Sequence, residues 1–149
     1  RWASKGHSLE QVVAQVEALV PKVNLLAFLD TLRYLSRSGR IRKIEAWAGS
    51  LLSVKPLTEL RLGEARVLER PRSRAKATQR LLDNMHRRVG GVPVIVNVME
   101  ADALEDARAL PLRIQSEFNC RELFLSQFTP VMGLHTGPGL LSIAFWAES

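Results

Sequence analysis

The sequence predicts an α/β (α+β) domain of two layers, in which helices cover a mixed sheet of about six strands. Its 149 residues, 46% hydrophobic and 24% charged, suffice for one domain with a hydrophobic core. Runs with a helical period alternate with short apolar runs that are typical of buried strands. A hairpin pattern in the middle of the chain interrupts any simple series of parallel units, which favours a sheet with both strand directions.

The first third of the chain predicts one helix before a strand and two helical stretches after it. Ser8 and Gln11 form a capping-box pattern that opens a helix ending near residue 19. The apolar run 23–29 predicts a strand buried on both faces. Asp30 or Thr31 then caps a short helix, and a further helical stretch is expected over residues 43–53.

The rest of the chain predicts a hairpin, two helices and three more strands. Residues 55–70 form the hairpin, in which Pro56 indicates that the outgoing strand starts at a sheet edge. Ser73 begins a helix, and Asp102 with Glu105 forms a capping box for another, which Pro111 is expected to kink or split. The three remaining strands are expected over residues 92–98, 123–128 and 140–146.

Composition narrows the classes of function. The single Cys120 excludes an internal disulfide and a cysteine-based metal site, and the three scattered histidines do not form a zinc motif. No nucleotide-binding motif is present, and we expect neither a cofactor nor a metal. Apolar runs are far shorter than the roughly 20 residues of a membrane span. These features favour a reducing, cytoplasmic setting.

A net charge of +6 indicates an anionic partner. The alternative function is therefore a nucleic-acid-binding module that uses the basic stretch 70–88. Only 6% of the residues are aromatic, however, and binding of single strands relies on exposed rings beside basic groups. An acidic protein or a phosphate-bearing ligand fits the charge as well.

The segment 133–139, GLHTGPG, is the most informative motif. Three glycines and a proline in seven residues specify an unusual backbone path, which often turns successive N–H groups toward one anion. His135 and Thr136 would add side-chain donors. A tight connection with a structural histidine is the competing interpretation. The basic turn 36–43 offers a second candidate, because an arginine such as Arg40 can bind a carboxylate in a fork; a solvated basic loop is its alternative.

Four blocks taken in order resemble the C-terminal part of the DegV family of bacterial fatty-acid-binding proteins. They are FLDTLRYL, SGRI, GSLLSVKP and PVMGLHTGPG, beginning at residues 28, 38, 49 and 130. Together they span nearly the whole chain. The sequence departs from the family pattern at Ser38 and Thr129, where glycines are common, and at Glu100, where many members have histidine.

The resemblance implies a lipid held between two domains, the first of which this chain lacks. Residues 1–22 would then be a linker and helix after that N-terminal domain, and residues 23–149 the C-terminal lipid-binding domain. The chain would be a non-catalytic subunit that presents a fatty acid to an ATP-binding kinase partner, so that the carboxylate becomes an acyl phosphate for phospholipid synthesis.

The resemblance also implies the residues of the site. His135 matches the family's histidine near the lipid head group, with Thr136 and Gly137 beside it, and Arg40 matches an arginine of the family's Gly-Gly-Arg-Ile turn. Ordinary core packing is the alternative for each residue that we expect to line the lipid tail. The expected tail residues are Ile41, Ile44, Trp47, Leu51 and Leu52.

A third reading is a phosphotransfer enzyme in which His135 itself carries the phosphoryl group. That chemistry needs a nucleotide site, and the sequence contains no such motif.

Overall fold

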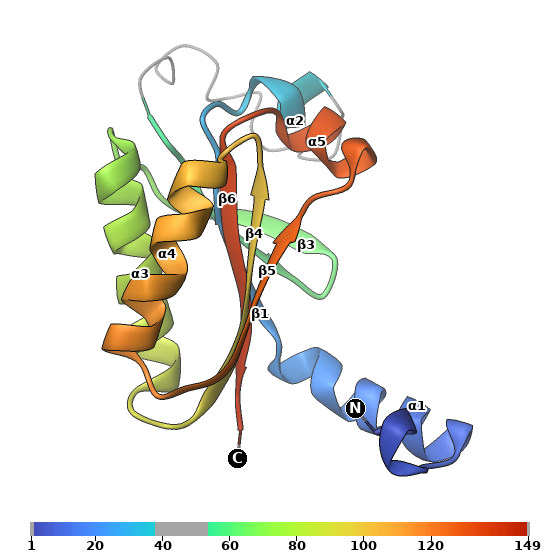
Figure 1. Cartoon of the computed structure of the whole chain (residues 1–149). Coiled ribbons are helices and arrows are strands. Elements are labelled where there is room, and N and C mark those ends of the chain that lie inside the picture. Colours follow the sequence, from blue (N-terminus) through green and yellow to red (C-terminus); the bar gives the residue numbers. More distant parts are fainter. Residues whose placement is uncertain (1, 38–53, 149) are drawn as a thin grey trace.

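The computed structural model describes residues 2–37 and 54–148. In this part of the chain, six strands form one mixed sheet in the order β3-β2-β1-β6-β4-β5. Helices α3 (Arg74–Val89) and α4 (Leu104–Glu117) lie side by side along one face of the sheet (Figure 1). The predicted two-layer α/β class with about six strands is confirmed.

The strand directions follow from the connections between them. Neighbouring strands pair antiparallel except β4 and β5, which run parallel because helix α4 forms the crossover between them. The strands are β1 (Asn24–Phe28), β2 (Leu57–Arg61), β3 (Glu64–Glu69), β4 (Val94–Ala101), β5 (Cys120–Gln127) and β6 (Leu140–Ala147).

The main hydrophobic core lies between the sheet and the α3–α4 layer. Side chains alternate between the two faces of a strand, so Leu26 and Phe28 of β1 point into this core, and Ile143 and Phe145 of β6 do the same. Leu81 of α3 is one of the helical residues that pack against them. This packing fixes which alternate residues remain for the opposite face.

Helix α1 (Leu9–Leu19) projects away from the sheet, with the 3-10 turns Ala3–Lys5 and Val20–Lys22 on either side of it (Figure 1). The predicted capping box is confirmed. The Ser8 hydroxyl accepts a hydrogen bond from the Gln11 N–H, and the Gln11 side chain accepts one from the Ser8 N–H. None of the residues of α1 is buried.

Two short helices, α2 (Arg33–Arg37) and α5 (Pro130–Thr136), pack against each other at one end of the sheet (Figure 1). Thr31 caps α2, because its hydroxyl oxygen accepts the Arg33 N–H at 3.2 Å. Helix α5 was missed by the sequence analysis, which treated residues 133–139 as one irregular connection. Pro130 at the start of α5 suits a helical first turn, where its missing N–H costs nothing.

The predicted capping box of Asp102 and Glu105 was wrong. Ala103 is the N-cap residue of α4, and no side chain caps it from that position. The Ala103 N–H instead donates to the buried Glu100 carboxylate at 2.9 Å. Asp102 precedes the N-cap and adopts a left-handed backbone conformation with φ 53°.

The helix split offered for Pro111 and the sheet edge expected at Pro56 were wrong. Pro111 does not split its helix, since α4 runs unbroken through it, held to the sheet by the buried Ala107, Leu110 and Ile114 on one face. Pro56 does not mark a sheet edge. It precedes β2, which is an inner strand, and its carbonyl accepts the Leu29 N–H at 3.2 Å. The expected helix over residues 43–53 lies outside the described residues.

Glu59 is an acid buried beside the core and held by two arginines. Its carboxylate is 2% exposed and accepts hydrogen bonds from Arg66 at 2.5 Å and Arg88 at 2.6 Å. Burial acts to raise the pKa of Glu59, but the hydrogen bonds from Arg66 and Arg88 outweigh it and hold the pKa below its ordinary value. Glu59 and its two arginines therefore link β2 to β3 and to α3.

We predict that Glu59→Gln destabilises the protein at pH 7 by about 2 kcal/mol, below the roughly 3–5 kcal/mol of a fully buried pair, because Arg66 is largely exposed and Arg88 keeps some contact with water. Since the folded-state pKa is lowered, this stabilisation is present above pH 4.5 and is lost as the pH falls through the folded value. Urea unfolding at pH 7 and at pH 4 measures both effects. The control Glu117→Gln removes an exposed pair and should change stability by less than about 1 kcal/mol; equal losses in the two variants would contradict the assignment.

Candidate functional site

An apolar cavity of about 370 Å³ lies on the face of the sheet opposite α3 and α4. This volume falls within the roughly 300–1,000 Å³ typical of small-molecule sites. The strands β1, β2, β3 and β6 form its floor, and residues of α2 and α5 close one end. Its lining residues are Leu25, Ala27, Leu29, Leu35, Thr58, Glu59, Leu60, Gly63, Ala65, Phe128, Met132, His135, Thr136 and Leu140.

Alternation along the strands produces this lining. Leu25 and Ala27 of β1 occupy the positions between the core residues, so they face the cavity rather than the helices. Leu60 of β2 stands opposite Ala65 of β3, and both line the cavity. The small side chains Ala27 and Ala65 leave space above the sheet that larger side chains would fill.

His135 and Thr136 bring the main polar groups of α5 to this cavity. His135 lies in the last turn of the helix, and its imidazole can donate or accept a hydrogen bond. The buried Thr136 hydroxyl donates to the Met132 carbonyl at 3.0 Å, so only its lone pairs are free to accept from another group. An apolar hollow with an imidazole at one end suits an amphiphilic ligand.

The loop after α5 is held in place by close contacts at two glycines. Gly137 and Gly139 have φ values of 78° and 84°, which side chains rarely adopt. A Cβ atom at Gly137 would overlap the Tyr34 ring of α2, and one at Gly139 would lie 2.6 Å from the Asp30 carboxyl carbon. The loop is therefore clasped between α2 and the chain that leaves β1.

The same loop does not offer the converging N–H groups expected from the sequence. The Gly137 N–H donates to the Gly133 carbonyl and the Gly139 N–H to the Ala101 carbonyl, both at 2.7 Å. These two amides end α5 and join the loop to β4. The expectation of a backbone anion site that uses them was wrong, and the polar character of this end of the cavity rests on side chains.

The face of the sheet toward the cavity also carries Ser142, which is not among the residues that line the cavity. Ser142 of β6 is fully buried, and its hydroxyl is the one buried side-chain polar atom in the described part of the chain that has no hydrogen-bond partner. Its strand neighbours are Ala27 of β1 and Met99 of β4.

The other expected site residues lie outside the described residues: Arg40 of the basic turn and the tail residues Ile41, Ile44, Trp47, Leu51 and Leu52. The structure instead adds cavity residues that the sequence analysis missed, chiefly on β1, β2 and β3. The available signal was the run 23–29, which is apolar on both faces. Its second face was read as ordinary burial rather than as the wall of a cavity.

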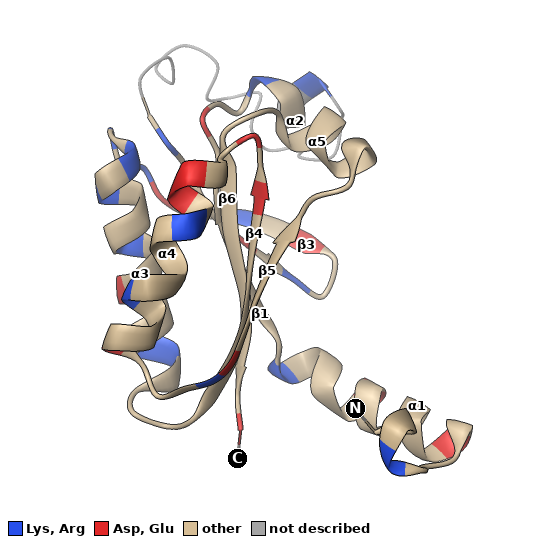
Figure 2. Ribbon diagram, in the orientation of Figure 1, with Lys and Arg blue, Asp and Glu red and all other residues tan. Residues whose placement is uncertain are grey.

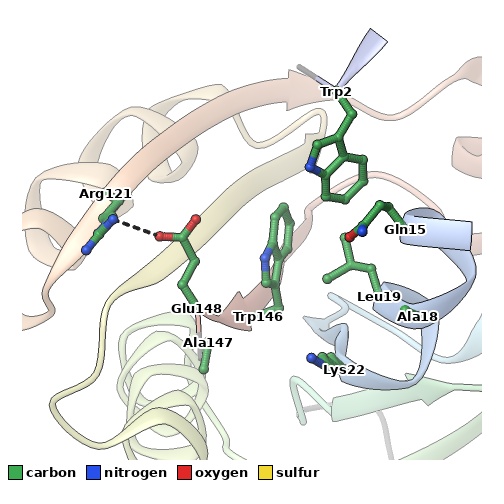
Figure 3. A pocket seen from close by; sticks show the side chains of 9 residues that line it. All are labelled: Trp2, Gln15, Ala18, Leu19, Lys22, Arg121, Trp146, Ala147 and Glu148. Atoms are coloured by element: carbon green, nitrogen blue, oxygen red, sulfur yellow. Dashed lines mark ion pairs between the residues drawn. The ribbon is translucent and has the colours of Figure 1, made fainter. Parts of the chain in front are cut away.

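A second hollow, of about 390 Å³, lies between α1 and the end of β6. Figure 3 shows the Trp2 and Trp146 rings reaching into it, with Gln15 and Leu19 of α1 across from them. It is more open to solvent and more polar than the first, and none of the predicted site residues that the structure describes lines it. The cavity beside His135 is therefore the better candidate site.

The basic helix proposed for nucleic acid is largely neutralised. In α3, Arg74 pairs with Asp30 and Asp106, Arg80 with Glu69 and Asp83, Arg87 with Glu69, and Arg88 with Glu59. Figure 2 shows acidic and basic residues interspersed in the α3–α4 layer. Phosphate binding needs cations that are free to replace counterions, so this surface does not favour the nucleic-acid alternative.

Other site types find little support in residues 2–37 and 54–148. This part of the chain holds no group of three or more His, Cys, Asp or Glu side chains placed to bind a metal ion. Burial raises the pKa of the Cys120 thiol, which makes it a poorer nucleophile. No helix within these residues has the length and apolar character needed to cross a membrane.

A family model described as an uncharacterised protein of the DegV family matches residues 1–148. The chain belongs to the DegV family. It is 37% identical over 142 residues to a DegV domain-containing protein of Streptomyces coelicolor, covering 95% of this chain and 50% of that protein. The DegV chain thus spans about half the length of the curated relatives that it matches.

Solved DegV structures share the fold. A fatty-acid-binding DegV family protein from Thermus thermophilus superposes with a TM-score of 0.87 at 26% identity, covering 99% of this chain and 53% of the other. DegV from Bacillus subtilis, described as a fatty acid binding protein, gives a TM-score of 0.78 at 27% identity, with 98% and 52% covered.

The loop geometry gives a matched pair of glycine variants. Gly137→Ala should destabilise the protein by about 1–3 kcal/mol, because the backbone conformation admits little but glycine and the methyl group meets Tyr34. Gly133→Ala lies within α5 with open space around it, and should be neutral or stabilising by up to about 1 kcal/mol. Urea unfolding of both variants measures the two changes in the free energy of unfolding. Equal changes would show that contact with Tyr34 does not hold the loop in place.

Proposed function

We propose that this DegV chain binds a long-chain fatty acid, with the acyl tail in the cavity above β1, β2 and β3 and the carboxylate near His135. The observation that carries the proposal is the pairing of an apolar cavity of about 370 Å³ with an imidazole at its α5 end. The fatty-acid-binding descriptions of the Thermus and Bacillus relatives, each above 25% identity, support the same class of ligand.

The two ends of the ligand contribute different amounts to the binding free energy. Burying about fifteen methylene groups at ~0.8 kcal/mol each gives roughly 12 kcal/mol of gross transfer free energy. Association takes back about 4–15 kcal/mol, and one hydrogen bond to the charged head group adds only about 1.5–3 kcal/mol. The tail therefore sets the affinity, and His135 and Arg40 set the orientation of the carboxylate.

The proposal includes a second module. Residues 1–22 would connect the lipid-binding domain, residues 23–149, to another domain that closes the cavity from the open side. Coverage of only about half of the relatives' length supports such a partner module. The exposed apolar residues of α5 beside the cavity, Val131 and Leu134, are suited to contact it.

The chain itself would not catalyse a reaction in this scheme. It would present the carboxylate to an ATP-binding fatty acid kinase subunit, which forms the acyl phosphate for phospholipid synthesis and so acts in the ATP-rich cytoplasm. Chemically, a carrier needs only to hold the carboxylate oxygen in line with the γ-phosphate of the partner's nucleotide. The imidazole of His135 is the group in the described cavity best suited to orient that oxygen.

The first test is recovery of the ligand. Native mass spectrometry of the complete natural polypeptide should reveal a bound fatty acid. Ala27→Phe, which fills the cavity floor, should lower its occupancy at least tenfold. Ala144→Phe is the matched control, on the same face of the sheet but outside the cavity lining. Absence of any fatty acid from repeated preparations, or equal occupancy in the two variants, would count against the proposal.

The second test separates orientation from binding. His135→Ala should leave folding and fatty acid affinity nearly unchanged, because the tail dominates the binding free energy, yet slow acyl phosphate formation by the kinase partner about 10²-fold or more. A calorimetric titration gives the affinity, and detection of acyl phosphate as hydroxamate gives the rate. Unchanged turnover would remove His135 from its assigned role.

A further inference from the structure

A polar junction lies behind the loop that follows α5. At its centre, Arg74 of α3 donates hydrogen bonds to the Asp30 carboxylate at 2.5 Å and to the Gly139 carbonyl at 2.7 Å. Its Nε donates to Asp106 of α4 at 2.7 Å, and its guanidinium lies 5.2 Å from the centre of the Phe28 ring. One side chain thus joins the starts of two helices, the end of β1 and the start of β6.

Asp30 extends the junction to the chain that enters β2. Lys55 pairs with the Asp30 carboxylate at 3.2 Å and also approaches the Asp30 carbonyl at 3.4 Å. The group then contains two carboxylates, Asp30 and Asp106, and two cations, Arg74 and Lys55, so its charges balance. Burial acts to lower the pKa of Arg74, but the hydrogen bonds to Asp106 and Asp30 outweigh it and raise this pKa, so the junction keeps its charge.

The junction is connected to the cavity by a short stretch of backbone. Gly139, whose carbonyl Arg74 holds, is also joined to the end of β4 through its N–H. Two residues earlier, Gly137 lies against the Tyr34 ring, and two residues before that stands His135. No side chain can be added at either glycine without displacing Asp30 or Tyr34. The position of the imidazole therefore depends on where Arg74 and Asp30 hold the loop.

We propose that Arg74, with Asp30 as its partner, is a positioning residue for His135. The inference rests on the proposed function for its consequence, the orientation of a bound carboxylate, but the positioning itself is a property of the ligand-free protein. The planar guanidinium meets three acceptors at once, which a lysine ammonium at the end of a flexible stem does not reproduce. Neither Arg74 nor Asp30 lines the cavity, so both act through the loop.

The histidine rings provide a direct readout. His135 reports the loop, and His86, near the other end of α3, packs edge-on against Phe118 at 4.6 Å between ring centres. In ¹H–¹³C correlation spectra of the complete natural polypeptide, Arg74→Gln should move the ring signal of His135 and leave that of His86 in place. His135→Ala assigns the signal. Arg80→Gln, a substitution of an ion-paired arginine on the same helix, should move neither.

Two results would overturn the inference. One is an unmoved His135 signal in Arg74→Gln. The other is an equal displacement of the His86 signal, which would mean that the substitution only loosens α3. If Arg74→Gln does not fold, Asp30→Asn replaces it, because it weakens the same contact from the opposite side and leaves α3 intact.

Titration with palmitate then separates this inference from the proposed function. In the unsubstituted protein, palmitate should shift the His135 signal; in Arg74→Gln, that shift should be lost while the palmitate affinity stays within about threefold, because the tail supplies most of it. Palmitate that binds Arg74→Gln and shifts His135 as before would refute the positioning role. If palmitate fails to shift His135 in the unsubstituted protein, the proposed function fails, and the ligand-free spectra still decide the role of Arg74.

Discussion

The alternation of side chains along the central strands β1 and β6 is the constraint on which the rest of the structure depends. One set of positions, including Phe28 and Phe145, packs against α3 and α4 and is fully buried. The other set, including Ala27 and Leu140, is thereby turned toward the cavity, and among the described residues the helices that line this cavity are α2 and α5, at one end of it. A stable core on one side and a hollow on the other follow from one pattern of strand residues.

A group of ion pairs lies at the end of the sheet where the cavity meets α5. Asp30, Lys55 and Arg74 come from three separate segments, and they meet where β1 ends, β2 begins and α3 starts. Partly exposed pairs such as these add little to global stability. The rigid guanidinium of Arg74 instead fixes the positions of the loops relative to the sheet. A ligand site depends on these positions, because a small displacement of an orienting group lowers reactivity far more than it lowers the folding free energy.

The sequence was sufficient for the fold and only partly sufficient for the site. Strand and helix periods predicted the six-stranded mixed sheet, because burial against α3 and α4 enforces those periods. The capping role given to Asp102 failed, since a tertiary contact from Glu100 satisfies the Ala103 N–H and no local pattern reveals it. Helix α5 was missed because its glycine and proline content outweighed its short helical pattern. Arg74 was read as one of several surface cations, since its two carboxylate partners lie more than 30 residues away on either side.

The distribution of charge explains why a basic chain need not bind nucleic acid. The sequence determines how many cations the chain has, but the fold determines which of them can bind a phosphate. The arginines of α3 are all paired with carboxylates: Arg74, Arg80, Arg87 and Arg88. Two of these pairs, at Glu59 and Asp30, serve to join strands to helices rather than to present charge. Among the described residues, by contrast, apolar side chains are exposed beside the cavity, on β2 (Leu60) and on α5 (Val131, Met132 and Leu134). Burying these apolar side chains provides more free energy than pairing the arginines, which already have carboxylate partners. An apolar ligand and a covering module are therefore favoured over a polyanion.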